Sequence, residues 1–547
     1  RKEYVYTLLT SLLRSRIESG DARLNVSDDS TKKVLRLALK SDNEAEIINA
    51  LELIPDNKEG EWDPDLMALL SNPSPIVRIA AIKRLGMLNK MKYTQAISGM
   101  FRDPDEYVKA AAISAFCELS RERAIHVIKV YLEDKSPAVK GSAVSGLIKH
   151  GGLDGILQAA EELKAMLIHN KPEMRKQAAK VLGDIQVKNF YQPVLELLQD
   201  PEPEVVTASI EAAGNMQSPE LVPALIYKLA QPKLVIIASK ALSRYGKSIE
   251  NILCKVLSNQ SENKAIRKAV PKIIAEIGSE IGFDILLSML DDPDPNIRYH
   301  VARSASKIKE KIPAVKFSHV KIDDILSNEL QSYYQQIAII EDLQFVEDLK
   351  TLHFKHPQIL LKDALIDRLK RTLNLIFALL EIKYPSSTIS LIYMNMQSEH
   401  KNVRANAIEL IDNLLEQNIK KLLLPIVEDG SGEEKIKSGA ESFEITRDTQ
   451  RSRLVELLKD RDPWILTCTI YMAERIGMKN LLAEIEPHLE HTNPLVRETT
   501  LQAIKTLGDP EKTKLAAQKR AEDGSKEVRK IAEQILLALE IKSPVAV

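Results

Sequence analysis

Residues 291–308 read DDPDPNIRYHVARSASKI and contain a turn followed by the start of a helix. Pro293 and Pro295 interrupt any preceding helix, because proline lacks a backbone N–H and fixes its own φ angle. Arg298 then falls in the first turn of the next helix. A cation there opposes the helix dipole and costs roughly 0.3–1 kcal/mol, so its presence requires a compensating partner.

The same turn and helix start recur along the chain, for example as SNPSPIVRIAAIKRLG, FRDPDEYVKAAAISAF and HTNPLVRETTLQAIKTLG. Aligned on Arg298, the series occupies Ile48, Arg78, Lys109, Lys140, Arg175, Val206, Ile236, Arg267, Arg298, Arg404, Leu466, Arg497 and Arg529. Steps of 30 to 35 residues separate the positions from Ile48 to Arg298. A period of this length is typical of stacked repeats, and it holds two short helices and two turns.

Most of the aligned positions carry a cation, so we expect a repeated anionic partner. The acidic residue of the preceding turn, in the unit stacked alongside, can supply it, and Asp103, Asp134, Asp200 and Asp292 are the candidates. The predicted structural ladder consists of Arg78, Lys109, Lys140, Arg175, Arg267, Arg298, Arg404, Arg497 and Arg529. Alanines after the cation allow close helix contact, and glycines such as Gly183 and Gly214 are expected at the following helix ends.

This pattern resembles the HEAT-repeat family over residues 40–310 and 395–545. The resemblance implies an all-α fold, an α-solenoid of antiparallel helix pairs that form a right-handed superhelix. We expect a regular array with N-terminal capping helices at 1–310 and irregular, longer helical units at 311–430. A loop insertion followed by C-terminal repeats is expected at 431–547.

The repeat is interrupted at two places. Residues 358–382 carry apolar side chains at helical spacing and predict one long helix that ends before Pro385. Residues 429–452 are polar and rich in Gly and Ser, which predicts a surface loop that is at least partly mobile.

The composition favours helices and offers no catalytic motif. Aromatic residues make up 5% of the chain and glycines number 20, while 76 Lys and Arg balance 77 Asp and Glu. This balance gives no reason to expect a nucleic-acid partner. Cys117, Cys254 and Cys468 are far apart and suggest neither disulfides nor a metal site. We expect no catalytic residue, no metal and no cofactor, and no run of apolar residues is long enough to span a membrane.

Basic and aromatic residues gather within the irregular region. They are Tyr333, Tyr334, Lys362, Arg368, Lys370 and Arg371. Such a set could hold a nucleotide or another phosphorylated ligand, or it could be an ordinary solvent-facing surface with half-buried tyrosines.

Three segments give a narrower resemblance. YVYTLLTSLLRSRI at 4–17, LIDRLKRTLNLIFALLEIKYP at 365–385 and VRANAIELIDNLLEQNIKKLLLPIVED at 403–429 are similar to the soluble region of bacterial proteins that fuse an ATP/ADP-translocase-like carrier to HEAT repeats. The chain begins without a methionine, inside an apparent helix, as an excised fragment would.

The carrier resemblance implies a non-catalytic regulatory scaffold in the cytoplasm. Its partners would be a protein on the concave surface, which the second helix of each unit would line, or a membrane carrier in the same full-length chain. A free-standing HEAT scaffold is the alternative. A HEAT-like bilin lyase or DNA-repair enzyme is a third class, for which the sequence offers no reactive site and no strongly basic face.

Overall fold

The computed structural model describes residues 29–54, 60–345 and 357–542. Within these residues the regular structure is helical throughout, and the chain divides into two compact units, Arg1–Ile273 and Ile274–Val547. The expected all-α solenoid of paired helices is therefore confirmed, whereas its superhelical handedness stays a prediction. Residues 4–17, quoted for the carrier resemblance, lie outside the described residues.

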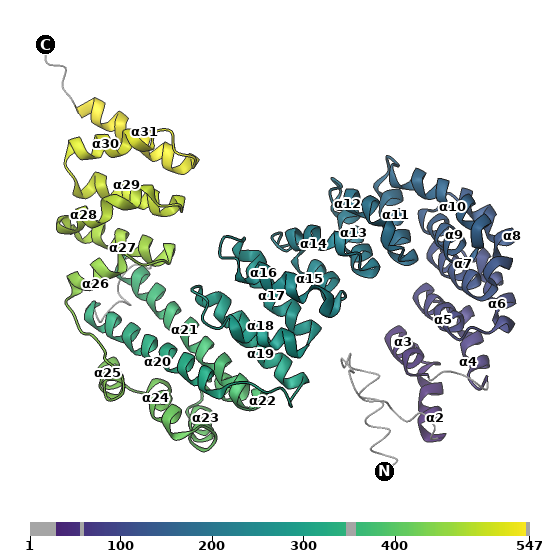
Figure 1. Cartoon of the computed structure of the whole chain (residues 1–547), viewed down its shortest axis with the longest axis horizontal. Coiled ribbons are helices and arrows are strands. Elements are labelled where there is room, and N and C mark those ends of the chain that lie inside the picture. Colours follow the sequence, from purple (N-terminus) through teal and green to yellow (C-terminus); the bar gives the residue numbers. More distant parts are fainter. Residues whose placement is uncertain (1–28, 55–59, 346–356, 543–547) are drawn as a thin grey trace. The chain divides into compact units, whose positions relative to one another are not determined.

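Unit 1 consists of short helices in antiparallel pairs (Figure 1). Their bounds are α2 (Asp29–Ala38), α3 (Glu44–Leu53), α4 (Asp63–Ala68), α5 (Pro75–Met87), α6 (Thr94–Gly99), α7 (Glu106–Ser120), α8 (Ile125–Ile128), α9 (Pro137–His150), α10 (Gly152–Leu167), α11 (Pro172–Ile185), α12 (Tyr191–Leu197), α13 (Pro203–Met216), α14 (Val222–Lys228), α15 (Val235–Ser243) and α16 (Glu250–Ser258). Helix α17 (Lys264–Ile277) contains the boundary between the units.

The helices of unit 1 that carry the aligned repeat positions form one continuous layer, in which α5, α7, α9, α11, α13 and α15 each pack against the next. Gly183 and Gly214 allow this close approach. A Cβ at Gly183 would lie 2.8 Å from the Cα of Ala212, and one at Gly214 would lie 2.8 Å from the Cα of Ala241. Both glycines lie in the last turns of α11 and α13, close to the expected helix ends, and they permit contact between neighbouring repeats.

Unit 2 combines regular repeats with longer helices. Their bounds are α18 (Glu280–Ser288), α19 (Pro295–Lys311), α20 (His319–Asp342), α21 (Pro357–Lys383), α22 (Ser386–Met396), α23 (Lys401–Leu414), α24 (Gln417–Val427), α25 (Gly432–Ala440), α26 (Gln450–Leu457), α27 (Pro463–Ile476), α28 (Leu482–Ile485), α29 (Pro494–Leu507), α30 (Pro510–Arg520) and α31 (Lys526–Lys542). The long helix expected at 358–382 is confirmed as α21.

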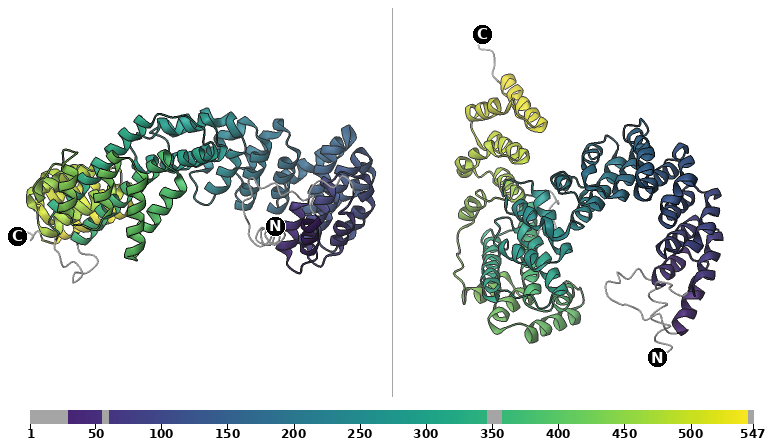
Figure 2. Two further views of the ribbon diagram at one scale, coloured as in Figure 1. Left: turned by 90° about the horizontal axis from the view of Figure 1, so that it is seen from below. Right: turned by 45° about the vertical axis from the view of Figure 1, so that its right-hand side comes forward.

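Helix α21 continues the layer of unit 2 across the region where the repeat fails. It packs against α19 and also against α27, and α29 and α31 follow in the same layer. Leu361, Ala364 and Leu365 of α21 share one apolar core with Ile465 and Leu466 of α27. Helices α22–α25 therefore come between α21 and α27 in the sequence although α21 and α27 pack together. Helix α25 packs on α20 (Figure 2).

The loop expected at 429–452 is wrong for its first part, because residues 432–440 form α25. The Ser431 side chain accepts a hydrogen bond from the Glu434 N–H, and the Glu434 carboxylate accepts one from the Ser431 N–H. This capping box starts the helix, and Ile436 then packs against Ile337 and Ala338 of α20.

Candidate functional site

The ion pair of Arg78 with Asp103 explains how the unfavourable positive charge in the first turn of its helix is compensated. Nε and Nη2 of Arg78 donate to the two carboxylate oxygens of Asp103 at 2.9 and 2.8 Å. Nη1 donates to the carbonyl oxygens of Asn72 and Pro73 in the preceding turn, at 2.8 and 3.0 Å. The guanidinium is thus held between the Asp103 carboxylate and the carbonyl oxygens of the turn before its own helix, and both Arg78 and Asp103 are buried.

Asp103 has a second function in its own repeat. Its Oδ1 also accepts a hydrogen bond from the Asp105 N–H at 2.9 Å, which closes the turn before α7. One carboxylate therefore shapes a turn and fixes the contact with the preceding repeat. Arg175 with Asp200, and Arg497 with Asp523, repeat this bidentate geometry.

These pairs also affect acidity. The hydrogen bonds from Arg175 lower the pKa of Asp200, and those from Arg497 lower the pKa of Asp523 to about 2. Where the cation is absent, the acid is absent too. Ile48, Val206, Ile236 and Leu466 replace it, and the residues 25 positions further along are Pro73, Gln231, Ser261 and His491.

The ladder position at Arg298 uses a residue of a long helix as its partner. Arg298 pairs with Glu329 of α20 at 2.8 Å and donates to the backbone oxygen of Asp292, so the expected ion pair with the Asp292 side chain was wrong. Glu329 of the long helix α20 thus takes the place of the turn carboxylate that pairs with the cation in the regular repeats.

Lys140 pairs with Glu162 at 2.9 Å and Arg404 with Asp429 at 3.5 Å. Arg267 donates to the carbonyl oxygen of Leu257, and Arg529 to that of Asp523. Lys109 forms no ion pair with any residue that the structure describes.

The basic and aromatic residues of the irregular region belong largely to internal contacts. Tyr334 is buried and donates to the Leu422 carbonyl oxygen at 2.7 Å. Tyr333 packs against the small apolar cluster at Ile337, and burial raises its pKa to about 12. Tyr333 is half-buried and Tyr334 is buried, because α20 turns both toward packed neighbours.

Two of the cations hold α21 to the turn before α27. Arg368 pairs with Asp460 at 2.7 Å and Arg371 with Asp462 at 3.1 Å. Asp460 Oδ1 accepts a hydrogen bond from the Asp462 N–H, as Asp103 does in its own turn. Arg368 is therefore the ladder cation of the irregular unit.

The remaining two cations of the set differ in exposure. Lys362 lies over the ring of Phe345, with its Nζ 5.9 Å from the ring centroid. Lys370 is exposed on the surface of α21.

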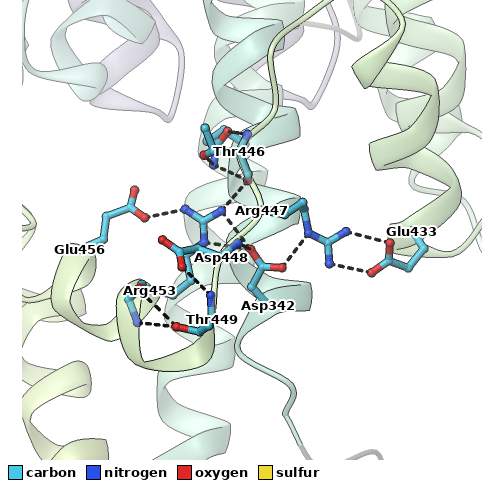
Figure 3. Close-up of polar contacts among 10 residues, drawn as sticks. Asp342, Glu433, Thr446, Arg447, Asp448, Thr449, Arg453 and Glu456 are labelled. Carbon is cyan, nitrogen blue, oxygen red and sulfur yellow. Dashed lines mark hydrogen bonds and ion pairs between the residues drawn. The ribbon is translucent and has the colours of Figure 1, made fainter.

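A buried charge centre fixes the chain after α25 (Figure 3). Asp342, the last residue of α20, accepts hydrogen bonds from Nε of Arg447 at 2.7 Å, Nε of Arg453 at 2.9 Å and the Asp448 N–H at 3.0 Å. Burial acts to raise the pKa of Asp342, but these donors hold it below its ordinary value. Arg447 also binds both carboxylate oxygens of Glu433. The segment that the sequence predicts to be mobile is therefore tied down.

A groove of about 290 Å³ runs over α7, α9, α11 and α13 in unit 1. Small side chains from these helices line it, namely Ala110, Ala138, Ser142, Ala208 and Ala212. Exposed charged residues, Lys180, Asp184 and Glu211, also line the groove, as does Tyr107, which is 58% exposed. The surrounding helices partly desolvate the Asp184 carboxylate even though its side chain is exposed, and this desolvation raises its pKa against the opposing charges of Lys149, Lys180 and Lys83.

The groove is lined by residues of four successive layer helices, α7, α9, α11 and α13. A second cavity of about 320 Å³ shares Lys180, Ala208 and Glu211 with it. Among the described residues there is no cluster of His, Cys, Asp and Glu that could hold a metal ion. No helix in the described ranges combines the length and apolar character needed to cross a membrane.

The fold and these repeated ion pairs define a HEAT-type α-solenoid. The family model described as HEAT repeats matches residues 160–243 and 250–317. These matched residues therefore resemble HEAT repeats, as the sequence pattern predicts. No curated protein sequence matches this chain.

Solved structures with similar folds share little sequence with the chain. The Escherichia coli protein YibA is 16% identical, with 49% of this chain and 97% of YibA covered and a TM-score of 0.29. Importin beta is 11% identical, with 98% and 85% covered and a TM-score of 0.31. Human deoxyhypusine hydroxylase, solved with glycerol, is 12% identical, with 56% and 98% covered and a TM-score of 0.21. Similarity this low adds nothing to the argument from the repeats.

Proposed function

We propose that this chain is a non-catalytic protein-interaction scaffold that binds a segment of a protein partner in the groove over α7, α9, α11 and α13. The observation that supports the proposal is the groove itself. Small side chains from four successive repeats leave space for a bound segment, and charged residues line the same groove. Tyr107 adds an exposed aromatic side chain, the type most often responsible for binding energy at protein interfaces.

The groove can be tested with matched variants in a pull-down from the source organism. Tyr107→Ala and Ser142→Arg should each reduce the recovery of a specific partner at least about tenfold, since one removes an anchor and the other fills the groove. Tyr227→Ala is the control, because Tyr227 is 64% exposed on α14 and outside the groove. Equal recovery with all three variants would refute this binding surface.

The finer proposal concerns the full-length protein. From the sequence resemblance, the scaffold is the cytoplasmic domain of a bacterial nucleotide-carrier-like protein, and its partner is then the carrier or a protein that regulates it. The coding sequence upstream of Arg1 tests this. Several encoded apolar segments of about 20 residues would support a membrane carrier in the same full-length protein. A start codon directly before Arg1 would instead support the free-standing scaffold.

A further inference from the structure

A cavity of about 700 Å³ lies beside the turns that follow α5, α7 and α9, all within unit 1. It is separate from the groove described above and is lined by backbone and side chains of these three turns. Four of its lining residues are basic or titrate to a cation: Arg121, Arg123, Lys149 and His150. Glu122 is the acidic residue among them.

None of these four residues forms an ion pair or side-chain hydrogen bond with any residue in the described ranges. This sets them apart from the ladder, where Arg78, Arg175 and Arg497 each bind a carboxylate through two nitrogens. The cavity therefore gathers cations whose charge is incompletely balanced within the protein. Three fixed positive charges face one carboxylate among the residues that line it.

Two further features agree with an electropositive cavity. Burial lowers the pKa of His150, and the positive charges of Lys149 and Arg121 lower it further against the opposing effect of Glu118. Arg121 itself has φ 50° and ψ −129°, a conformation that favours glycine. At the end of α11 and α13, Gln186 and Gln217 instead adopt the ordinary left-handed conformation. Arg121 therefore has a backbone conformation that is strained for a residue with a side chain.

We propose that this cavity binds a phosphate-type dianion, held by Arg121, Arg123 and Lys149. The guanidinium groups supply paired N–H donors of the kind that suit phosphate oxygens. The imidazole of His150, which also lines the cavity, can add a hydrogen bond. Glu122 lies close to Gly152, because a Cβ built on Gly152 would be 3.5 Å from its Oε1. Its negative charge therefore opposes the bound anion.

The charges predict that some substitutions weaken pyrophosphate binding and that another tightens it. Calorimetric titration of the whole chain with sodium pyrophosphate can test both changes in affinity. Arg121→Gln with Arg123→Gln should weaken binding at least about tenfold, by loss of two charge-assisted contacts. Glu122→Gln should tighten it about fivefold, the effect of removing one like charge at short range in a solvent-exposed site. Lys149 is left unchanged in these variants because it also acts on Asp184.

Sodium chloride at matched ionic strength is the control, and a short phosphoserine peptide is the second ligand. Tighter binding of the peptide assigns the site to a phosphorylated protein segment, and tighter binding of pyrophosphate assigns it to a small phosphate compound. The proposal is overturned if neither ligand saturates below about 10 mM, if chloride gives the same signal, or if Glu122→Gln and the arginine variants shift affinity in the same direction.

Discussion

Replacing Arg78 by alanine tests whether the ladder holds neighbouring repeats together. The substitution removes two hydrogen bonds to Asp103 and two to backbone carbonyls. It leaves Asp103 only 9% exposed and with a single backbone donor, from Asp105. Removing one partner of a buried ion pair typically destabilises by about 3–5 kcal/mol, so we expect a loss of about 3 kcal/mol in the local free energy of opening.

The partner substitution completes a double-mutant cycle. Asp103→Asn keeps an acceptor for the Asp105 N–H but removes the charge, so the coupling energy between the two sites reports the ion pair. We expect about 2 kcal/mol for this coupling. Lys109→Ala is the matched control. Lys109 occupies the same repeat position without an ion pair among the described residues, so its loss should change stability by less than about 0.5 kcal/mol.

Hydrogen exchange measured by mass spectrometry is the suitable assay. Long repeat arrays do not unfold as one cooperative unit, so a single melting temperature is poorly defined, whereas exchange reports α5 and α7 directly. Additive effects of Arg78→Ala and Asp103→Asn, or a loss in Lys109→Ala as large as that in Arg78→Ala, would refute the ladder.

Three more outcomes follow from the structure. The pKa of Asp523 is about 2 in the folded protein, below its value of about 4 in the unfolded chain. Its stabilisation of about 2 kcal/mol is therefore present above about pH 4 and is lost as the pH falls toward about 2. Hydrogen exchange in α29 and α31 should show this loss in the wild type and not in Arg497→Ala. Asp342→Ala should expose the bond after Arg447 to trypsin at least about tenfold faster than in the wild type, and an unchanged cleavage rate would mean that the charge centre does not fix this segment. Arg121→Gly should stabilise α7 by about 1 kcal/mol by relieving the strained backbone while weakening pyrophosphate binding in calorimetry; a loss of stability would show that Arg121 is held for packing.

The regular part of the fold could be predicted because its rules are local. Proline, acid and cation recur within one turn, and the pairs of Arg78 with Asp103 and Arg175 with Asp200 each span 25 residues. A fixed separation of this kind is visible as a period. The bounds of α21 were also predictable, since its apolar side chains repeat at helical spacing until Pro385.

The contacts that could not be predicted join residues far apart in sequence. Arg368 performs the ladder role toward Asp460 across 92 residues, so no period reveals it. Asp342 is separated by more than 100 residues from Arg447 and Arg453. Helix α25 did carry a local signal, because Ser431 and Glu434 have the spacing of a capping box, but the glycines and polar residues around them favoured a loop.

The missing cations at Val206 and Ile236 have a mechanical consequence for unit 1. Between α5 and α7 the joint is stiffened by a bidentate ion pair, whereas α13 and the end of α15 are joined by apolar packing and by single hydrogen bonds, such as the one that the Tyr245 hydroxyl donates to the carbonyl oxygen of Ala213. Apolar contacts are non-directional, so they tolerate small rotations that would break an Arg–Asp pair. Resistance to bending therefore differs along unit 1, and we expect an applied load to bend it first between α13 and α15.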